Sequence, residues 1–152
     1  MNVSENATSG AGLPSAPHSP LHAGFGQLTP QEAFEFISNN PDALFVDVRM
    51  ELEHFFVGHP QGVVNIPWQE YPDFEINPDF VKEVSHLAKK EQPVVLICRS
   101  GHRSIDAGNA LMDAGFIRVY NVLEGFEGDR DGSHHRSSLN GWRFRGLPWV
   151  QC

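Results

Sequence analysis

One short segment of the sequence places a nucleophile beside two cations and a glycine. The segment runs Cys98-Arg99-Ser100-Gly101-His102-Arg103-Ser104 and directly follows the apolar residues 94–97. A loop at the carboxyl end of a buried strand can aim successive backbone N–H groups at a cysteine sulfur, and the following helix adds the positive end of its dipole. Because both effects favour a thiolate over a thiol, the pattern indicates that Cys98 is a catalytic nucleophile rather than a small buried apolar residue.

The side chains around Cys98 suit the binding of an anion. Arg99 and Arg103 can hold an oxyanion such as the sulfonate part of thiosulfate, and Gly101 supplies the backbone freedom that a tight turn needs. Arg103 also opens the predicted helix, where its charge is unfavourable unless it faces an anion. Arg99 is either a substrate contact or a solvated loop residue, and His102 either tunes access to the sulfur or is only exposed. The predicted substrate-binding residues are Arg99, Ser100, Gly101, His102, Arg103 and Ser104.

A thiolate held in this way can carry out sulfur transfer. It attacks the outer sulfur of a donor to give a persulfide, and the same N–H groups and cations then stabilise the persulfide anion. An acceptor nucleophile removes the sulfur in a second step. This chemistry requires neither a metal nor an organic cofactor, so we expect none.

Two kinds of pattern predict the elements that position this loop. Four apolar runs predict buried strands, at residues 44–48, 63–66, 94–97 and 119–123. Three amphipathic segments predict helices, at residues 30–39, from residue 77 to before residue 93, and at residues 104–114. The first helix begins with a capping box, in which Thr29 is the N-cap, Pro30 the first helical residue and Glu32 the returning carboxylate. Buried strands alternating with helices predict an α/β sandwich, with a central, mostly parallel sheet and helices on both faces.

The chain length of 152 residues suits one domain with a tail. Residues 1–24 are rich in Ser, Ala, Gly, Pro and Asn, so we expect a flexible N-terminal tail there and a single domain over residues 25–152. Within that domain, residues 127–141 have no periodicity and predict a polar loop. The aromatic residues 142–150 are expected to pack back onto the body.

The composition excludes several classes of protein. Lys and Arg total 11 against 19 Asp and Glu, a net charge of -8, which excludes a general electrostatic attraction to nucleic acid or anionic lipid. No apolar run approaches the roughly 20 residues of a membrane span, and no signal peptide is recognisable, so we expect a soluble, cytoplasmic protein. The two cysteines are too few for a secreted disulfide scaffold, which favours reduced thiols.

Four segments of the chain resemble the rhodanese sulfurtransferases. The active-site loop of that family resembles residues 98–103, and its early strand with an acidic continuation resembles residues 44–49 followed by Glu51. Its Gly-His-Ile-Pro-Gly-Ala-x-Asn-Ile-Pro segment is similar to residues 58–67, and its strand ending in Leu-x-Gly-Gly is similar to residues 121–126, with Phe126 at the second glycine. The resemblance covers about residues 25–150. It implies a rhodanese-like fold and transfer of sulfur from thiosulfate to cyanide or a thiol through a Cys98 persulfide.

Two alternatives to this enzyme remain open. Related phosphatases and arsenate reductases use a Cys-x5-Arg loop that wraps a whole oxyanion, with an arginine six positions after the cysteine. Here that position is Ser104, and Arg103 lies five positions on, so the loop resembles the shorter sulfurtransferase cradle and the phosphatase is the less favoured reading. The other alternative is a persulfide carrier or interaction module that passes sulfur to the thiol of a protein partner.

Other conspicuous residues have structural interpretations. Asp47 and Arg49 are expected to form a buried ion pair, and His59 to brace its loop. Trp142 and Trp149 are expected to be core anchors, with a place at the mouth of the active site, beside Phe126, as the alternative.

Neither the histidines nor the second cysteine predicts a further site. The pairs His54 with His59 and His134 with His135 have the wrong spacing for two ligands on one helix face, and Asp129 with Asp131 lacks the later ligands of a calcium loop, so we expect no metal. Cys152 ends the sequence and is expected to have no role. A second thiol within reach of Cys98 would instead act in a persulfide relay or a protective disulfide.

Overall fold

A computed structural model of the chain describes residues 22–152. The tail predicted for residues 1–24 therefore lies, except for its last three residues, outside the described residues. Within the described part of the chain, no helix has both the length and the apolar character needed to cross a membrane.

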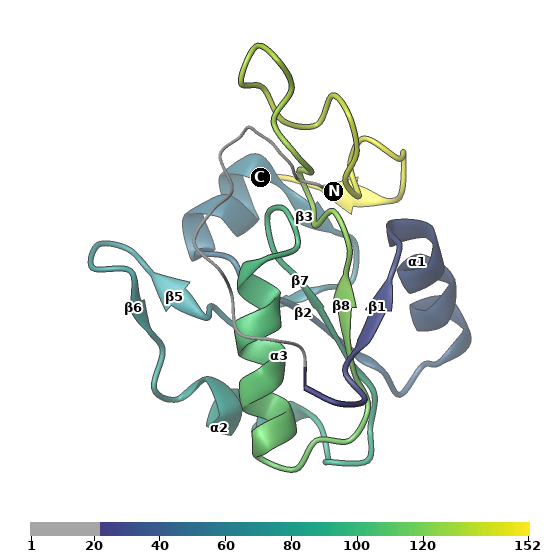
Figure 1. Cartoon of the computed structure of the whole chain (residues 1–152), viewed down its shortest axis with the longest axis vertical. Helices are drawn as coiled ribbons and strands as arrows, with labels where there is room; N and C mark the ends of the chain where they lie inside the picture. The colour runs from purple at the N-terminus through teal and green to yellow at the C-terminus, as the bar shows by residue number, and fades with distance from the viewer. Residues whose placement is uncertain (1–21) are drawn as a thin grey trace.

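A five-stranded parallel sheet forms the centre of the fold, as the sequence predicts (Figure 1). Its strand order is β1-β8-β7-β2-β4. The strands are β1 (Gly26–Leu28), β8 (Val119–Val122), β7 (Val94–Ile97), β2 (Leu44–Asp47) and β4 (Val64–Asn65). The four predicted strands are all present, within a residue or two at their ends, whereas β1 was not predicted because Gly26-Gln27-Leu28 contains no apolar run.

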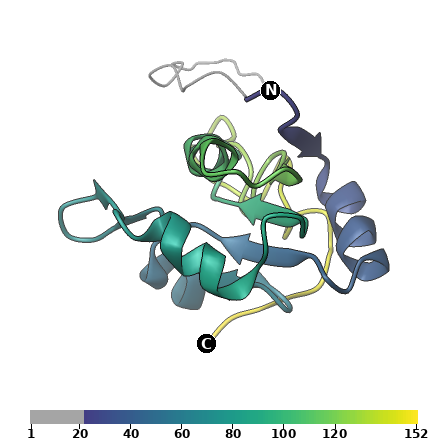
Figure 2. The ribbon, with the colours of Figure 1, turned by 90° about the horizontal axis from the view of Figure 1, so that it is seen from below.

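Helices cover both faces of the sheet (Figure 2). On one face, α2 (Phe80–Leu87) and α3 (Arg103–Asp113) pack against side chains such as Val94 and Leu96. On the other face, α1 (Pro30–Asn39) and the C-terminal segment pack against Val95 and Ile97. Successive side chains of a strand point to opposite faces, so β7 is apolar throughout because both of its faces are buried.

Short elements at the periphery complete the fold and were not predicted. A π-helix, η1 (Glu53–Val57), follows the end of β2. The antiparallel pair β3 (His59–Pro60) and β9 (Trp149–Val150) ties the end of the chain to the residues after η1, and β5 (Gln69–Glu70) pairs with β6 (Glu75–Ile76). Trp142 is 1% exposed within the second core cluster, which confirms that the aromatic segment packs back onto the body.

The capping box at the start of α1 gives a direct test of local stability. The Thr29 hydroxyl accepts a hydrogen bond of 3.1 Å from the Glu32 N–H, and the Glu32 carboxylate accepts one of 2.9 Å from the Thr29 N–H. Thr29→Ala should therefore cost about 1 kcal/mol of the free energy of unfolding, which lowers Tm by about 3 °C. Thermal unfolding followed by circular dichroism measures the change. The control Ser38→Ala, at an exposed position of the same helix, should leave Tm unchanged; an equal loss in both variants would contradict this account of the cap.

Candidate active site

Cys98 is the first residue after β7, at the carboxyl edge of the sheet. Cys98 is 1% exposed, and its sulfur is contacted by one residue of the loop that follows and by one residue of the first turn of α3. The Gly101 N–H donates to Cys98 Sγ over 3.1 Å, and Ser104 Oγ lies 3.3 Å from the same atom. Gly101 has a φ of +97°, a conformation that glycine adopts without strain, and this turn brings its N–H onto the sulfur. The loop therefore curls around one sulfur atom.

The loop after β8 holds the backbone of the Cys98 loop from the other side. The Phe126 N–H donates to Cys98 O over 2.8 Å, and the Glu127 N–H donates to Arg99 O over 2.9 Å. Gly125 lies between these contacts with a φ of +65°, and a Cβ there would come within 2.5 Å of Cys98 O. A close backbone approach and a left-handed conformation thus both require glycine at this position.

Phe126 is a core residue rather than part of an open mouth. Its side chain is fully buried, and its ring packs 4.7 Å from the Arg49 guanidinium and 5.6 Å from that of Arg143. Trp149 makes an edge contact with it at 5.9 Å between ring centroids. Trp142 is buried in the same cluster, which agrees with the expectation that these aromatic side chains are core anchors.

Arg103 forms a two-pronged ion pair with Glu53 of η1. Arg103 Nη1 and Nη2 each donate to one carboxylate oxygen of Glu53, both over 2.9 Å. Burial would lower the pKa of the Arg103 guanidinium, but the hydrogen bond to Glu53 and the negative charge of an ionised Cys98 raise it above its ordinary value. Burial would likewise raise the pKa of the Glu53 carboxyl, but the hydrogen bonds and charge of Arg103 hold it below its usual range. Both groups are therefore charged, and Glu53 stabilises the cation at the start of α3 beside the sulfur.

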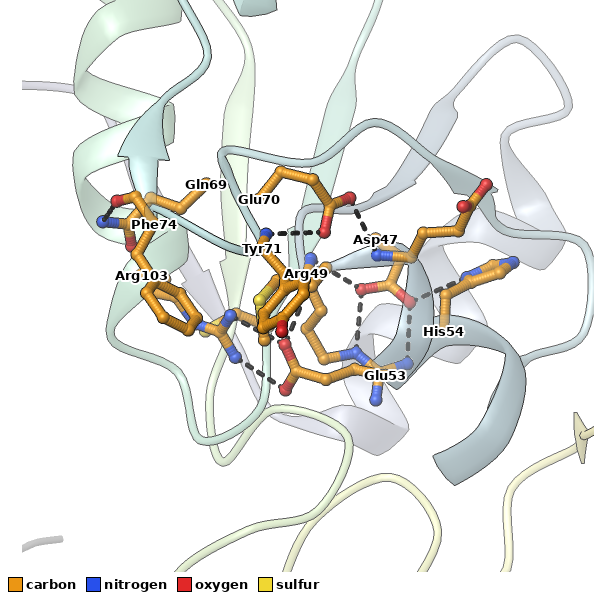
Figure 3. Close-up of polar contacts among 12 residues, drawn as sticks. Asp47, Arg49, Glu53, His54, Gln69, Glu70, Tyr71, Phe74 and Arg103 are labelled. Atoms are coloured by element: carbon orange, nitrogen blue, oxygen red, sulfur yellow. Dashed lines mark hydrogen bonds and ion pairs between the residues drawn. The ribbon is translucent and has the colours of Figure 1, made fainter.

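The residues that position Glu53 are joined by buried ion pairs (Figure 3). Arg49 Nε donates to Asp47 Oδ1 over 2.9 Å, and Arg49 Nη2 donates to Asp47 Oδ2 over 2.7 Å and to Gly58 O over 2.6 Å. His54 Nδ1 lies 2.9 Å from Asp47 Oδ2. The predicted buried pair of Asp47 and Arg49 is confirmed, since both side chains are 0% exposed. His59 braces its loop as expected, because its Nδ1 lies 2.8 Å from the His54 carbonyl oxygen.

The other predicted substrate-binding residues lie at the surface of the loop. Arg99 is exposed, and Ser100 and His102 are half-buried. Arg136, from the polar loop, joins them there, since its Nη1 donates over 2.6 Å to Gly128 O and the Gly128 N–H donates over 3.1 Å to Arg99 O. Burial and the nearby charge of Arg99 lower the pKa of the Arg136 guanidinium.

Sequence reasoning missed two functional candidates, Glu53 and Arg136. Glu53 is 50 residues from its partner in the chain, so no local spacing reveals the pair. Arg136 is in a segment without periodicity, where only its charge could have attracted notice. The two cysteines are free thiols, Cys98 buried and Cys152 exposed. Among residues 22–152, no group of three or more His, Cys, Asp or Glu side chains is arranged to hold a metal ion.

The chain is similar to proteins of one family. Residues 29–130 match the family described as Rhodanese-like domain. Thiosulfate sulfurtransferase GlpE of Glaesserella parasuis is 34% identical over 104 residues, which make up 68% of this chain and 85% of that protein. An uncharacterized protein of Rickettsia conorii is 33% identical over 123 residues, 78% of this chain and 91% of that protein. The crystal structure of Rv0390 from M. tuberculosis has a TM-score of 0.76 and 43% identity, covering 84% of this chain and 98% of that one.

The buried Asp47 carboxyl predicts how stability depends on pH. Burial alone would raise its pKa, but hydrogen bonds from His54 and Arg49 and the charge of Arg49 lower it below the ordinary value of 3.8. A carboxyl whose pKa is lowered by folding contributes stability above its unfolded pKa and loses it as the pH falls through the folded pKa. Asp47→Asn should therefore lower the free energy of unfolding by about 3 kcal/mol at pH 7. The difference in free energy of unfolding between wild type and Asp47→Asn should become smaller below about pH 4.

Urea unfolding at a series of pH values from 7 to 3 measures this gap. The control Asp42→Asn changes an exposed carboxyl and should alter the free energy of unfolding by less than about 0.5 kcal/mol at any of these pH values. If the gap between wild type and Asp47→Asn widened or stayed constant as the pH fell, the ion pairs would not be the source of the stability.

Proposed function

The chain belongs to the rhodanese-like domain family, and we propose that it is a sulfurtransferase that moves sulfane sulfur through a persulfide on Cys98. The donor is a small anion such as thiosulfate, and the acceptor is cyanide or a thiol. The observation that carries the proposal is the 3.1 Å hydrogen bond from the Gly101 N–H to Cys98 Sγ, in a loop closed around a single sulfur atom. Such a donor stabilises negative charge on the sulfur before and after it is loaded.

The proposed reaction has two displacement steps. The Cys98 thiolate attacks the outer sulfur of thiosulfate, a new S–S bond forms, and the S–S bond of thiosulfate breaks as sulfite leaves with the electron pair. Cyanide then attacks the outer sulfur of the persulfide. Thiocyanate leaves, and the electron pair of the broken S–S bond returns to Cys98 as a thiolate. The two steps balance without a further oxidant or reductant.

The surroundings of Cys98 support a small anionic donor. Arg103 is paired with Glu53, so Arg99 is the loop cation that is exposed and outside the ion pairs formed among the described residues. Arg136 adds a second positive charge beside it, and the two like charges gain stability when an anion lies between them. The burial of Cys98, which is 1% exposed, also suits a small donor better than a bulky one. We therefore assign initial donor binding to Arg99 with support from Arg136.

The geometry argues against a phosphatase. A phosphate-binding loop needs a guanidinium free to grip the oxyanion from six positions after the cysteine. Ser104 is at that position, and the guanidinium of Arg103 is already occupied by the two oxygens of Glu53. A persulfide carrier would use the same sulfur site, but it would turn over slowly with thiosulfate and exchange sulfur rapidly with a partner thiol.

The persulfide step can be observed directly by mass. After brief incubation with thiosulfate, the wild-type chain should gain about 32 Da, the mass of one sulfur. Cyanide should remove the added mass. Cys98→Ser should show no gain, while its circular dichroism spectrum stays that of the wild type. A gain that survives in Cys98→Ser would sink the mechanism, and release of phosphate from an aryl phosphate would favour the phosphatase.

The second cysteine should be dispensable for this reaction. The Cys152 backbone N–H donates to Phe55 O over 3.2 Å, while its thiol is exposed. Cys152→Ala should therefore change the steady-state rate of thiocyanate formation by less than about twofold, which corresponds to under about 0.5 kcal/mol. A tenfold or larger loss, about 1.4 kcal/mol, would instead assign Cys152 to a persulfide relay.

A further inference from the structure

Asn121 is a buried polar residue in the middle of an apolar strand. It lies in β8 between Tyr120 and Val122, and its side chain is 0% exposed. Burying an amide is costly unless its polar atoms are hydrogen-bonded. Here Asn121 contacts both residues that touch the Cys98 sulfur: its Oδ1 bonds to Ser104 Oγ, and its Nδ2 lies 3.3 Å from Gly101 O. The position of this amide is therefore linked directly to the sulfur site.

The hydrogen-bonding partners determine which way the amide points. The Gly101 carbonyl oxygen can only accept, so Nδ2 of Asn121 faces it and Oδ1 faces Ser104. An amide oxygen also only accepts, which means that the Ser104 hydroxyl donates to Asn121. The orientation is reinforced by Gln27, whose Oε1 accepts from Asn121 Nδ2 over 2.7 Å.

This orientation restricts what Ser104 can offer to the sulfur. A hydroxyl has one proton, and that proton is committed to Asn121. At 3.3 Å from Cys98 Sγ, the Ser104 oxygen then presents only lone pairs, which suit a thiol that donates its S–H. When the thiol loses its proton to a base in solution, the hydroxyl must turn away from Asn121 before it can donate to the sulfur anion.

We propose that Asn121 is a positioning residue for the Cys98 sulfur, which competes with the sulfur anion for the single hydroxyl proton of Ser104. The proposal deepens the proposed sulfurtransferase function, because it concerns the nucleophile of that reaction. It assigns the reactivity of the loop to a residue of the neighbouring strand, outside the loop itself.

Alkylation by iodoacetamide tests the proposal without any sulfur donor. The rate is measured from pH 5 to pH 10 on the full chain carrying Cys152→Ala, so that Cys98 alone is modified. Asn121→Leu releases the Ser104 hydroxyl to the sulfur anion, and the pH midpoint of alkylation should fall by about one unit, the size expected for one hydrogen bond to a charged atom. In a chain that also carries Ser104→Ala, Asn121→Leu should not lower the pH midpoint of alkylation.

The comparison separates this effect from the other charges near the sulfur. The charged groups around Cys98 are Arg99, the next residue in the chain, and Arg103, whose charge interacts with that of Cys98. Behind Arg103 lie its partner Glu53 and the buried pair of Asp47 and Arg49. All of them are retained in every variant, so their contribution cancels. Asn77→Ala is a matched control, since Asn77 is a half-buried asparagine that donates over 3.1 Å to Pro67 O, and it should leave the midpoint unchanged.

A milder variant covers the case in which Asn121→Leu does not fold. Gln27 is exposed, so Gln27→Ala preserves the core while removing the 2.7 Å bond that holds the Asn121 amide. Gln27→Ala should also lower the pH midpoint of alkylation, by less than Asn121→Leu does. The effect should again require Ser104.

Two outcomes would overturn the proposal. The first is an unchanged or raised midpoint in Asn121→Leu and Gln27→Ala. The second is a fall of equal size with and without Ser104, which would show that the amide acts on the sulfur by another route. Neither outcome bears on whether thiosulfate loads Cys98, and a failure of that loading would leave the alkylation result intact.

Discussion

The buried carboxylate of Asp47 constrains the whole of the site. A carboxylate that is 0% exposed must be paired, and here its partners are Arg49, two residues after the end of β2, and His54 from η1. Holding His54 fixes the π-helix, and with it the adjacent Glu53 that pairs with Arg103 at the start of α3. A charge buried at the end of β2 thereby determines where the cation beside Cys98 lies. π-Helical turns are rare and occur often at functional sites. Here the irregular turn places Glu53 where it can pair with Arg103.

Arg49 connects this network to the opposite side of the Cys98 loop. Within the described residues its Nη1 atom is buried without a hydrogen-bond partner, but the guanidinium packs over the ring of Phe126. The attraction of a desolvated guanidinium for an aromatic ring compensates in part for the missing hydrogen bond. Phe126 in turn donates its backbone N–H to Cys98 O. An aromatic ring at this position, where the rhodanese resemblance has glycine, thus links the buried charges to the backbone of the loop.

Residues beyond the family match take part in the same arrangement. The match ends at residue 130, yet Arg143 packs over Phe126 and donates over 2.9 Å to Val57 O at the end of η1. Trp149 packs against the same phenyl ring, and β9 pairs with β3 just after η1. The C-terminal segment therefore supports the π-helix and the loop after β8 from outside. It completes a core that the matched residues alone leave open on that side.

The main helices and strands could be predicted from neighbours in the chain, whereas the contacts between distant residues could not. The capping box of α1 and the strand before Cys98 were found because a few adjacent residues suffice to specify them. The pairing of Arg103 with Glu53 joins residues that no spacing rule connects, so the charge of Arg103 was interpreted through the substrate alone. Asn121 did carry a signal, since a lone amide within an otherwise apolar strand needs buried partners, but the sequence could not show that they surround the sulfur.

Burial of the sulfur explains why a backbone N–H is enough to stabilise negative charge on it. In a site shielded from water, one N–H directed at an anion has a larger effect than it has in solvent, because the local dielectric constant is lower. Such a site needs few charges, and Arg103, at the start of α3, is already neutralised by Glu53. A fully unpaired guanidinium at that place would hold a tetrahedral oxyanion more strongly than a sulfur atom. The ion pair leaves the sulfur with a directed but weak donor, the Gly101 N–H. For the proposed persulfide this is an advantage, because an intermediate that is bound too tightly would not release its sulfur to the acceptor.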